Sequence, residues 1–403
     1  MNTDAINRKR YAYLFSAALS FLILGLVYAW SLFATPLAQV YGWKLSDVNV
    51  TFTICMMSFC VGGLLGVRIL NRVGLRLAIL LAAGLLICGF AGTALLAQTG
   101  IWALYLFYGV VIGCGTGYGY NVVIATVTMW FPDKTGFASG VLFMGFGLGS
   151  ITLGNLTRGI IDAAGVPVAL GVVAIVAGTV FCFLALFLKR APEKIGDLLG
   201  VQRKTKTAKN TVAKNHKLLK DPAFYTYYLW ATIVLGAGLV MIKSSMQGAL
   251  ELGVDATLAA VIVGIVPIVN GASGLSMGVI FDKKGQQFSM TLVAVIAFGS
   301  SALLACAFAF NLSALYVLGC LTLVMAYGSV APLAAGFARV RYDERDYPRY
   351  LAVVNTDIAG GSLFQQAVVT SCAGVSLAIY LAMTFFGAVA FAASLVAARL
   401  MKK

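Results

Sequence analysis

The sequence predicts an all-helical membrane protein with twelve transmembrane helices, arranged as two repeats of six. Three observations support this fold class. The chain is far more apolar than a soluble domain, its apolar residues fall into twelve long runs, and a loop of similar sequence occurs once in each half. Together they indicate a protein that works inside a lipid bilayer.

Composition alone excludes an ordinary soluble domain. Hydrophobic residues make up 61% of the 403 residues and charged residues only 11%, whereas a soluble domain carries about 25% charged residues to cover its surface. In lipid the backbone must satisfy its own hydrogen bonds, so only helices or a closed barrel can span the bilayer. Because the apolar runs are about 20 residues long rather than alternating segments of about 10, they predict helices.

Twelve apolar runs are expected to cross the membrane. They lie at 13–38, 48–70, 76–98, 101–130, 137–161, 167–189, 224–249, 256–281, 289–310, 312–338, 350–370 and 375–398. Lys and Arg gather in alternate connections, which favours the cytoplasmic side for those connections and for both termini. The first run is too long for a cleavable signal peptide. We therefore expect a multi-pass protein of the cell (inner or plasma) membrane.

Several functional classes are not supported by the sequence. The net charge of +15 comes from short basic loops, so no nucleic-acid partner is expected. The eight Cys residues are scattered singly and the one His, His216, lies in a Lys-rich loop, which predicts neither a disulfide framework nor a metal site. Motifs of metalloproteases, nucleophile elbows and phosphate loops are absent, so we expect no cofactor and no enzyme activity.

A basic stretch divides the chain into two weakly similar halves. The predicted organisation is a six-helix bundle at 1–189, a cytoplasmic basic linker at 190–221 and a second six-helix bundle at 222–403. The loop ILNRVG after the second run matches IFDKKG after the eighth, with the same interval separating Asn71 from Asp282 and Gly74 from Gly285. Parallel repeats of this kind place a binding site between the halves near the bilayer midplane.

These loops resemble the signature loop of the major facilitator superfamily. Residues 25–37 and 113–150, which include a glycine-rich helix and the sequence WFPDK, are similar to the oxalate/formate antiporter family, itself similar to the monocarboxylate transporters. The resemblance implies the major facilitator fold, a small-molecule substrate and a gating role for Asp282. It implies no such role for Asn71, which stands where the family has Asp.

The second half departs from that family at two cationic positions. The resemblance expects Arg in the eighth helix where this chain has Gly274, and Lys in the eleventh near the position of Asp357. Oxalate, a dianion, is therefore not the expected substrate.

Charged residues inside the apolar runs are candidate functional residues, because each costs roughly 2.5–3.5 kcal/mol to insert into a bilayer. Lys243 is either an anion-binding cation or a side chain that reaches the outer interface. Asp357 is a candidate coupling residue that carries a proton; an ion pair with Lys243 and a local hydrogen bond are alternatives. Arg158, with Asp162 one turn later, is an interface anchor or an outer gate.

Polar-tipped residues at membrane depth form a candidate substrate-binding set. Tyr and Asn donate hydrogen bonds to a carboxylate, and the Tyr ring adds an apolar surface; helix–helix hydrogen bonding is the alternative reading. The set consists of Tyr28, Trp30, Tyr118, Tyr120, Asn121, Lys243, Asn270, Tyr327 and Gln365. Pro36, Pro267 and Pro332 are expected to allow local breaks in their helices.

Three hypotheses follow. The first is a secondary active transporter that moves a small organic anion, a monocarboxylate, by alternating access, coupled to protons or to a counter-anion. The second keeps the transporter but gives it a neutral or cationic solute, with Asp357 as the counter-charge. The third is a membrane sensor without transport. Membrane lipid surrounds the protein in each case, and the family resemblance implies a monomer.

Overall fold

The computed structural model describes residues 3–192, 195–199, 218–342, 347–372 and 374–402, and for a few helical residues it describes the backbone alone. The chain forms two compact units. The first contains residues 1–133, 145–202 and 351–353, and the second contains 134–144, 203–350 and 354–403. The predicted boundaries at 189 and 222 stay a prediction. Each unit is described separately below.

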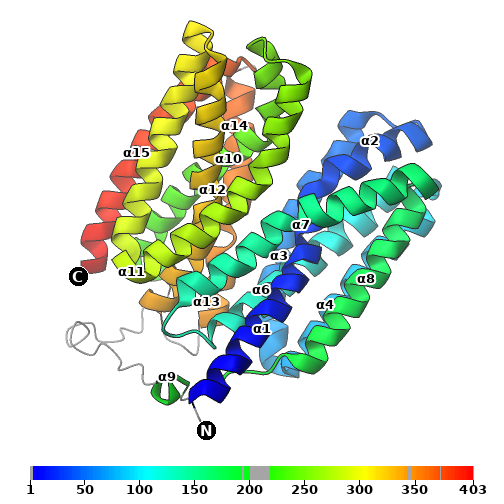
Figure 1. Cartoon of the computed structure of the whole chain (residues 1–403), viewed down its shortest axis with the longest axis vertical. Helices are drawn as coiled ribbons and strands as arrows, with labels where there is room; N and C mark the ends of the chain where they lie inside the picture. Colours follow the sequence, from blue (N-terminus) through cyan, green and yellow to red (C-terminus); the bar gives the residue numbers. More distant parts are fainter. Residues whose placement is uncertain (1–2, 193–194, 200–217, 343–346, 373, 403) are drawn as a thin grey trace. The chain divides into compact units, whose positions relative to one another are not determined.

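Helices make up nearly all of the first unit (Figure 1). They are α1 (Thr3–Leu24), η1 (Gly25–Ala29), α2 (Trp30–Tyr41), α3 (Leu45–Val73), α4 (Leu75–Leu96), η2 (Ala97–Thr99), α5 (Ile101–Leu104), η3 (Tyr105–Ile112), α6 (Gly113–Thr128), α7 (Thr135–Ala164), α8 (Val166–Phe187) and α9 (Ile195–Leu198). The start of α7, up to residue 144, belongs to the second unit. Neighbouring elements such as α1, η1 and α2 join end to end into single membrane passes, and η3 is a π-helical stretch that continues into α6.

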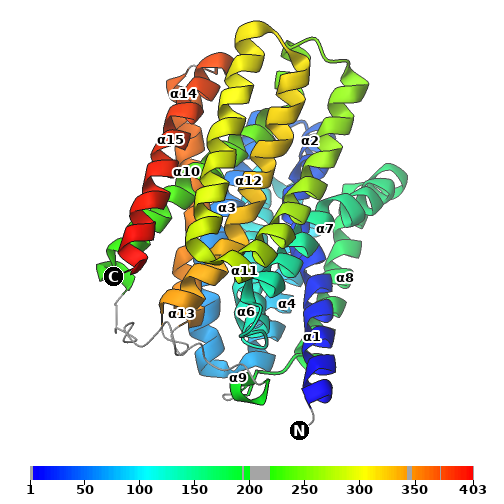
Figure 2. The same ribbon diagram turned by 60° about the vertical axis from the view of Figure 1, so that its left-hand side comes forward.

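The second unit repeats the helical pattern. Its elements are η4 (Leu218–Lys220), α10 (Pro222–Glu251), α11 (Ala256–Phe310), α12 (Ser313–Arg341), α13 (Tyr347–Val354), α14 (Asp357–Ser371) and α15 (Ser376–Lys402). Residues 351–353 of α13 belong to the first unit. Within it α11 packs against α12 and α15, and α10 packs against α14 (Figure 2).

The described residues account for the twelve predicted passes. Ten segments are long and apolar enough to cross a membrane by the criteria of length and composition. One of them, Gly264–Phe310, contains two passes, because Gly285 interrupts the 55-residue α11 with φ 82°. A further pass is divided between α13 and α14, each too short to qualify alone. The twelve-helix prediction is confirmed.

The repeated loop has the same backbone conformation in both halves. Gly74 has φ 81° and ψ 168°, and Gly285 has φ 82° and ψ 174°. Residues with a Cβ rarely adopt this conformation, so glycine at both positions lets one helix end and the next begin without a longer connection. The sequence match between the two loops is therefore a structural match.

The helices of the first unit approach closely where glycine faces backbone. A methyl group at Gly117 of α6 would overlap the carbonyl of Phe59 on α3, and one at Gly62 of α3 would overlap the carbonyl of Cys114 on α6. The outer surface carries large apolar side chains instead: Ile175 and Phe310, one in each unit, are both 70% exposed. Small residues between helices and large apolar residues outside are typical of packing in lipid.

Candidate functional site

An aromatic cluster lies inside the first unit, where four membrane passes meet. The Tyr120 ring lies 5.1 Å from that of Phe21, 5.5 Å from Phe59 and 5.9 Å from Phe146, and Phe146 lies 5.3 Å from Tyr28. Tyr28 is half-buried and the other four are buried. The structure thus brings two predicted residues, Tyr28 and Tyr120, together through phenylalanines that the sequence did not single out.

Trp30 has a structural contact of its own. Its indole Nε1 donates a hydrogen bond to Asn49 Oδ1 at 3.2 Å, and its ring lies 4.5 Å from that of Tyr108. Both contacts join α2 to neighbouring helices. The helix–helix reading therefore describes Trp30 better than the substrate-binding one.

Tyr118 and Asn121 lie at the interface between α6 and α3. Tyr118 is 2% exposed and its hydroxyl has no hydrogen-bond partner among the described residues. The amide of Asn121 donates to the carbonyl of Gly117 one turn earlier, at 3.1 Å. Asn121 is thus bonded within its own helix, whereas the buried Tyr118 hydroxyl has no such bond among the described residues.

The candidate residues of α11 and α12 are also buried. Asn270 Oδ1 has no partner among the described residues, and its helix approaches α12 so closely at Gly328 that a methyl group there would overlap the Asn270 carbonyl. Tyr327 is 2% exposed and packs its ring against Gly238 of α10. Gln365 of α14 is 3% exposed.

Gly274 lies where the family resemblance expects arginine, and its surroundings are tightly packed. A Cβ at this position would lie 2.7 Å from the Phe143 ring and 3.0 Å from the carbonyl of Gly328. Any side chain here would therefore require the Phe143 ring to shift. The packing of the second unit thus favours glycine at this position.

Asp357 stands where the eleventh pass is interrupted. α13 ends at Val354 and α14 begins at Asp357, and the hydroxyl of Tyr228 on α10 donates to the carbonyl of Thr356 at 2.9 Å. Asp357 is 3% exposed, and its Oδ2 has no hydrogen-bond partner among the described residues. Within that part of the chain Asp357 forms no ion pair either.

The other two charged residues predicted inside the membrane passes are Lys243 and Arg158. The side chain of Lys243 lies outside the described residues, so its role and its proposed ion pair with Asp357 stay predictions. Arg158 Nε lies 4.0 Å from Asp162 Oδ2, with the two side chains 68% and 71% exposed. An exposed pair of this kind contributes little to stability, and the geometry favours the anchor over the gate.

Asp282 caps the start of α7. Its Oδ1 accepts a hydrogen bond from the backbone N–H of Gly136 at 2.9 Å, and its Oδ2 accepts one from Phe137 at 2.7 Å, both within the second unit. A carboxylate on the free N–H groups of a helix N-terminus also interacts favourably with the helix dipole. Asn71, its counterpart in the repeat, is exposed.

Two buried ion pairs were not predicted. In the first ion-pair cluster, Arg10 at the start of α1 donates to Asp133 Oδ1 at 2.6 Å, and its guanidinium lies 5.0 Å from the Phe131 ring. The two charged side chains are 7% and 22% exposed. This cluster ties the first helix of the unit to the end of the fourth pass.

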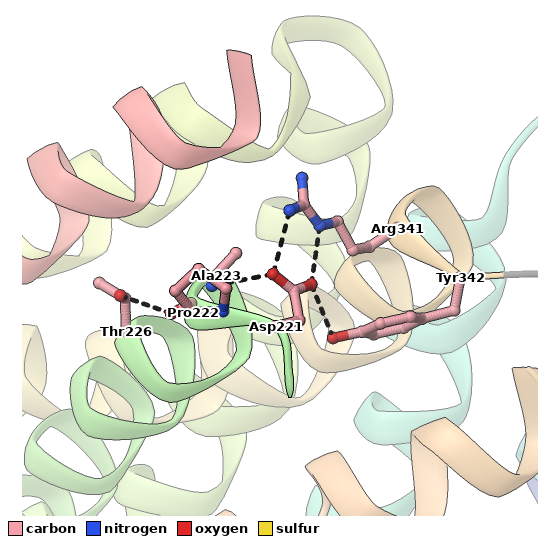
Figure 3. Close-up of polar contacts among 6 residues, drawn as sticks. All are labelled: Asp221, Pro222, Ala223, Thr226, Arg341 and Tyr342. Atoms are coloured by element: carbon pink, nitrogen blue, oxygen red, sulfur yellow. Dashed lines mark hydrogen bonds and ion pairs between the residues drawn. The ribbon is translucent and has the colours of Figure 1, made fainter. Parts of the chain in front are cut away.

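In the second ion-pair cluster the acidic residue lies near the start of the helix and the basic residue is its distant partner, the reverse of the first cluster. Asp221 precedes α10 and accepts hydrogen bonds from Arg341 at 2.9 and 3.0 Å, from the Tyr342 hydroxyl at 3.2 Å and from Ala223 N–H at 3.0 Å (Figure 3). Its side chain is 0% exposed. The Asp221–Pro222 pair is a helix-start signal that sequence reasoning could have used, but the partners lie 120 and 121 residues away.

Comparisons with known proteins give the family. The model of the Major Facilitator Superfamily matches residues 13–365. The oxalate:formate antiporter of Oxalobacter formigenes is 25% identical over 72% of this chain and 68% of its own. The uncharacterized MFS-type transporter YhjX of Escherichia coli is 26% identical over 75% and 74%.

Solved structures agree with the fold. The proton:xylose symporter XylE, bound to a bromodeoxyglucose, superposes with a TM-score of 0.77 over 96% of this chain and 95% of its own, at 15% identity. The family match covers most of the sequence, and proteins of this family are membrane transporters rather than enzymes. The chain therefore belongs to the Major Facilitator Superfamily and is a multi-pass membrane transporter.

Proposed function

We propose that the protein carries a small organic anion, a monocarboxylate, by alternating access, and that transport is coupled to protons or to a counter-anion. The similarity to an oxalate:formate antiporter supports the substrate class. Glycine at position 274 supports a single negative charge on the substrate, because it supplies no cation there and even a Cβ would crowd the Phe143 ring. The proposed location is the cell membrane, with both termini in the cytoplasm.

The observation that carries the coupling is the buried Asp357. A carboxylate that is 3% exposed and has no cation against it among the described residues is costly in its ionised form. It becomes stable when a positive charge binds, and it must release that charge where water reaches it. Binding and release of a positive charge at Asp357 would then be linked to the conformational change of alternating access.

The aromatic cluster is the proposed surface for the apolar part of the substrate. Tyr28 is its half-buried member and presents both a ring and a hydroxyl. On the second unit, the unpartnered Oδ1 of the Asn270 amide and the buried Gln365 are the proposed polar contacts. We assign Asp282 a gating role, because its two hydrogen bonds to α7 must break if that helix end separates from α11.

The test is solute exchange in proteoliposomes that contain the purified protein. We expect labelled monocarboxylates such as formate or lactate to exchange, and oxalate to be a poor competitor. Asp357→Asn should keep exchange at equal concentrations on both sides but lose accumulation driven by an ion gradient; Asp162→Asn, which changes an exposed carboxylate, is the matched control. If no carboxylate exchanges in the wild-type protein, the proposed substrate class is wrong.

The same buried carboxylate favours a second candidate, a cationic solute that pairs directly with Asp357. Amines would then compete for transport, and Asp357→Asn would abolish competition by amines while any carboxylate transport survived. Competition by carboxylates alone would exclude this candidate.

A further inference from the structure

The interruption of the eleventh pass places polar atoms inside the second unit. The last helical residue of α13 is Val354, and α14 starts at Asp357, so Asn355 and Thr356 lie outside regular helix. Backbone carbonyls at a helix end lack intrahelical partners. In membrane transporters such interruptions persist where the freed groups line a cavity or bind an ion.

The contacts between α10 and α14 place Asp357 against α10. Tyr228 bonds to Thr356, and one turn later Thr232 Oγ1 lies 2.7 Å from the Cβ position of Gly360. The two helices therefore run side by side in a fixed register. Asp357 shares a buried stripe of α14 with Gly361, whose Cβ position lies 2.8 Å from the Leu235 side chain of α10.

The atoms gathered at this register are oxygens. Asp357 Oδ2 and Thr232 Oγ1 are both buried and have no hydrogen-bond partner among the described residues. Thr356 adds a hydroxyl that lies 3.1 Å from the Tyr228 hydroxyl. Asp357 and Gly360 lie three residues apart on α14, and side chains at this spacing on one helix have Cβ atoms about 5–6 Å apart. Because Thr232 Oγ1 lies 2.7 Å from the Cβ position of Gly360, one small ion can reach the unpartnered oxygens of both helices.

We propose that Asp357, Thr232 and the Thr356 region form a binding site for a monovalent alkali cation, with Na⁺ as its ligand. One carboxylate with neutral oxygens balances the charge of a hard monovalent ion; among the described residues no group of three His, Cys, Asp or Glu gathers to compensate an ion of higher charge. A proton alone neutralises Asp357 but leaves the Thr232 hydroxyl without a partner, whereas Na⁺ uses both oxygens. This inference rests on the proposed function in one respect, the role of Asp357 in coupling.

The test is thermal unfolding of the purified full-length protein in NaCl, KCl and choline chloride at equal ionic strength and fixed pH. Na⁺ binding to the folded state should raise the Tm in a saturable way, with a smaller rise in K⁺ and none in choline. Binding of labelled ²²Na⁺ to the same protein is the second readout. Equal melting in Na⁺ and choline, with no ²²Na⁺ binding, overturns the proposal.

Substitutions of single residues test which side chains bind Na⁺. Asp357→Asn should lose the Na⁺-dependent shift entirely, and Thr232→Val should weaken Na⁺ at least about tenfold, the loss of one ligand of about 1.4 kcal/mol. Thr226→Val is the matched control, because Thr226 is a half-buried residue of the same helix whose hydroxyl already donates to the carbonyl of Pro222. A full Na⁺ response in Asp357→Asn or in Thr232→Val contradicts the site.

Transport separates this inference from the proposed function. One outcome is carboxylate uptake driven by a pH gradient in sodium-free proteoliposomes, together with a Tm that is the same in NaCl and in choline chloride. This outcome would refute the Na⁺ site but would not contradict the proposed function. A Na⁺ response that depends on Asp357 in a protein that carries no carboxylate would refute the proposed substrate and leave the Na⁺ site standing.

Discussion

Replacing Asp221 by Asn should be among the most destabilising single changes in the second unit. Its carboxylate is 0% exposed and accepts hydrogen bonds from Arg341, Tyr342 and Ala223. Asn keeps the shape but loses the charge, and its amide N–H₂ meets donors rather than acceptors. Leaving the Arg341 guanidinium, which is 14% exposed, without its partner costs about 3–5 kcal/mol, or about 10 °C in Tm for a unit of this size.

The assay is thermal unfolding of the purified protein in detergent, with a second variant as control. In Asp221→Leu/Arg341→Met both charges are replaced by apolar groups, so most of the loss should be recovered. If Asp221→Asn melts within about 2 °C of wild type, on the order of 1 kcal/mol or less, the pair contributes little and the reasoning from burial is wrong.

The same pair predicts a pH dependence. Burial raises the pKa of Asp221, but the hydrogen bonds from Arg341 and Ala223, the charge of Arg341 and the Tyr342 hydroxyl lower it, and the net pKa lies below its ordinary value. Because the folded pKa is below the unfolded one, the stabilisation is complete above about pH 5 and is lost as the pH falls through the folded pKa. The Tm gap between wild type and Asp221→Asn should therefore be constant near neutral pH and shrink below about pH 4.

Three further changes test other contacts, each by its effect on Tm. Arg10→Met should cost about 2 kcal/mol, less than Asp221→Asn because Asp133 is 22% exposed and water can solvate it; an unchanged Tm would contradict this. Gly117→Ala should destabilise by about 3 kcal/mol or more, because its methyl overlaps the backbone of α3, whereas Gly84→Ala enters open space and should not. Asp282→Ala should cost about 1–2 kcal/mol through the lost helix cap, and a Tm equal to that of wild type would show that the cap is weak.

The passes and the repeat could be predicted because they depend on local sequence. A run of about 20 apolar residues is sufficient for a membrane pass, and glycine at positions 74 and 285 marks the two repeated turns. The expected breaks at the three prolines were wrong. The helices α2, α11 and α12 continue through Pro36, Pro267 and Pro332. The non-helical residue of α11 is Gly285, and the irregular turn of the first pass is at Gly25–Ala29, before Pro36.

The candidate site was less predictable, for two physical reasons. In lipid every face of a helix is apolar, so hydrophobic periodicity does not distinguish an inward Phe59 or Phe146 from one that faces lipid. The interruption before Asp357 lacks proline and glycine, and the Tyr228 hydroxyl that bonds to it belongs to a helix 128 residues away. Contacts of that range cannot be read from spacing along one chain.

The two ion-pair clusters occupy equivalent positions in the two halves of the sequence. Arg10 and Asp221 are separated by the same interval as Asn71 and Asp282, and so are Phe131 and Tyr342. Equivalent helices thus begin with opposite charges, and each pairs with a partner inside its own unit. A chimera that exchanges Arg10 and α1 with Asp221 and α10 would therefore set like charges against each other twice.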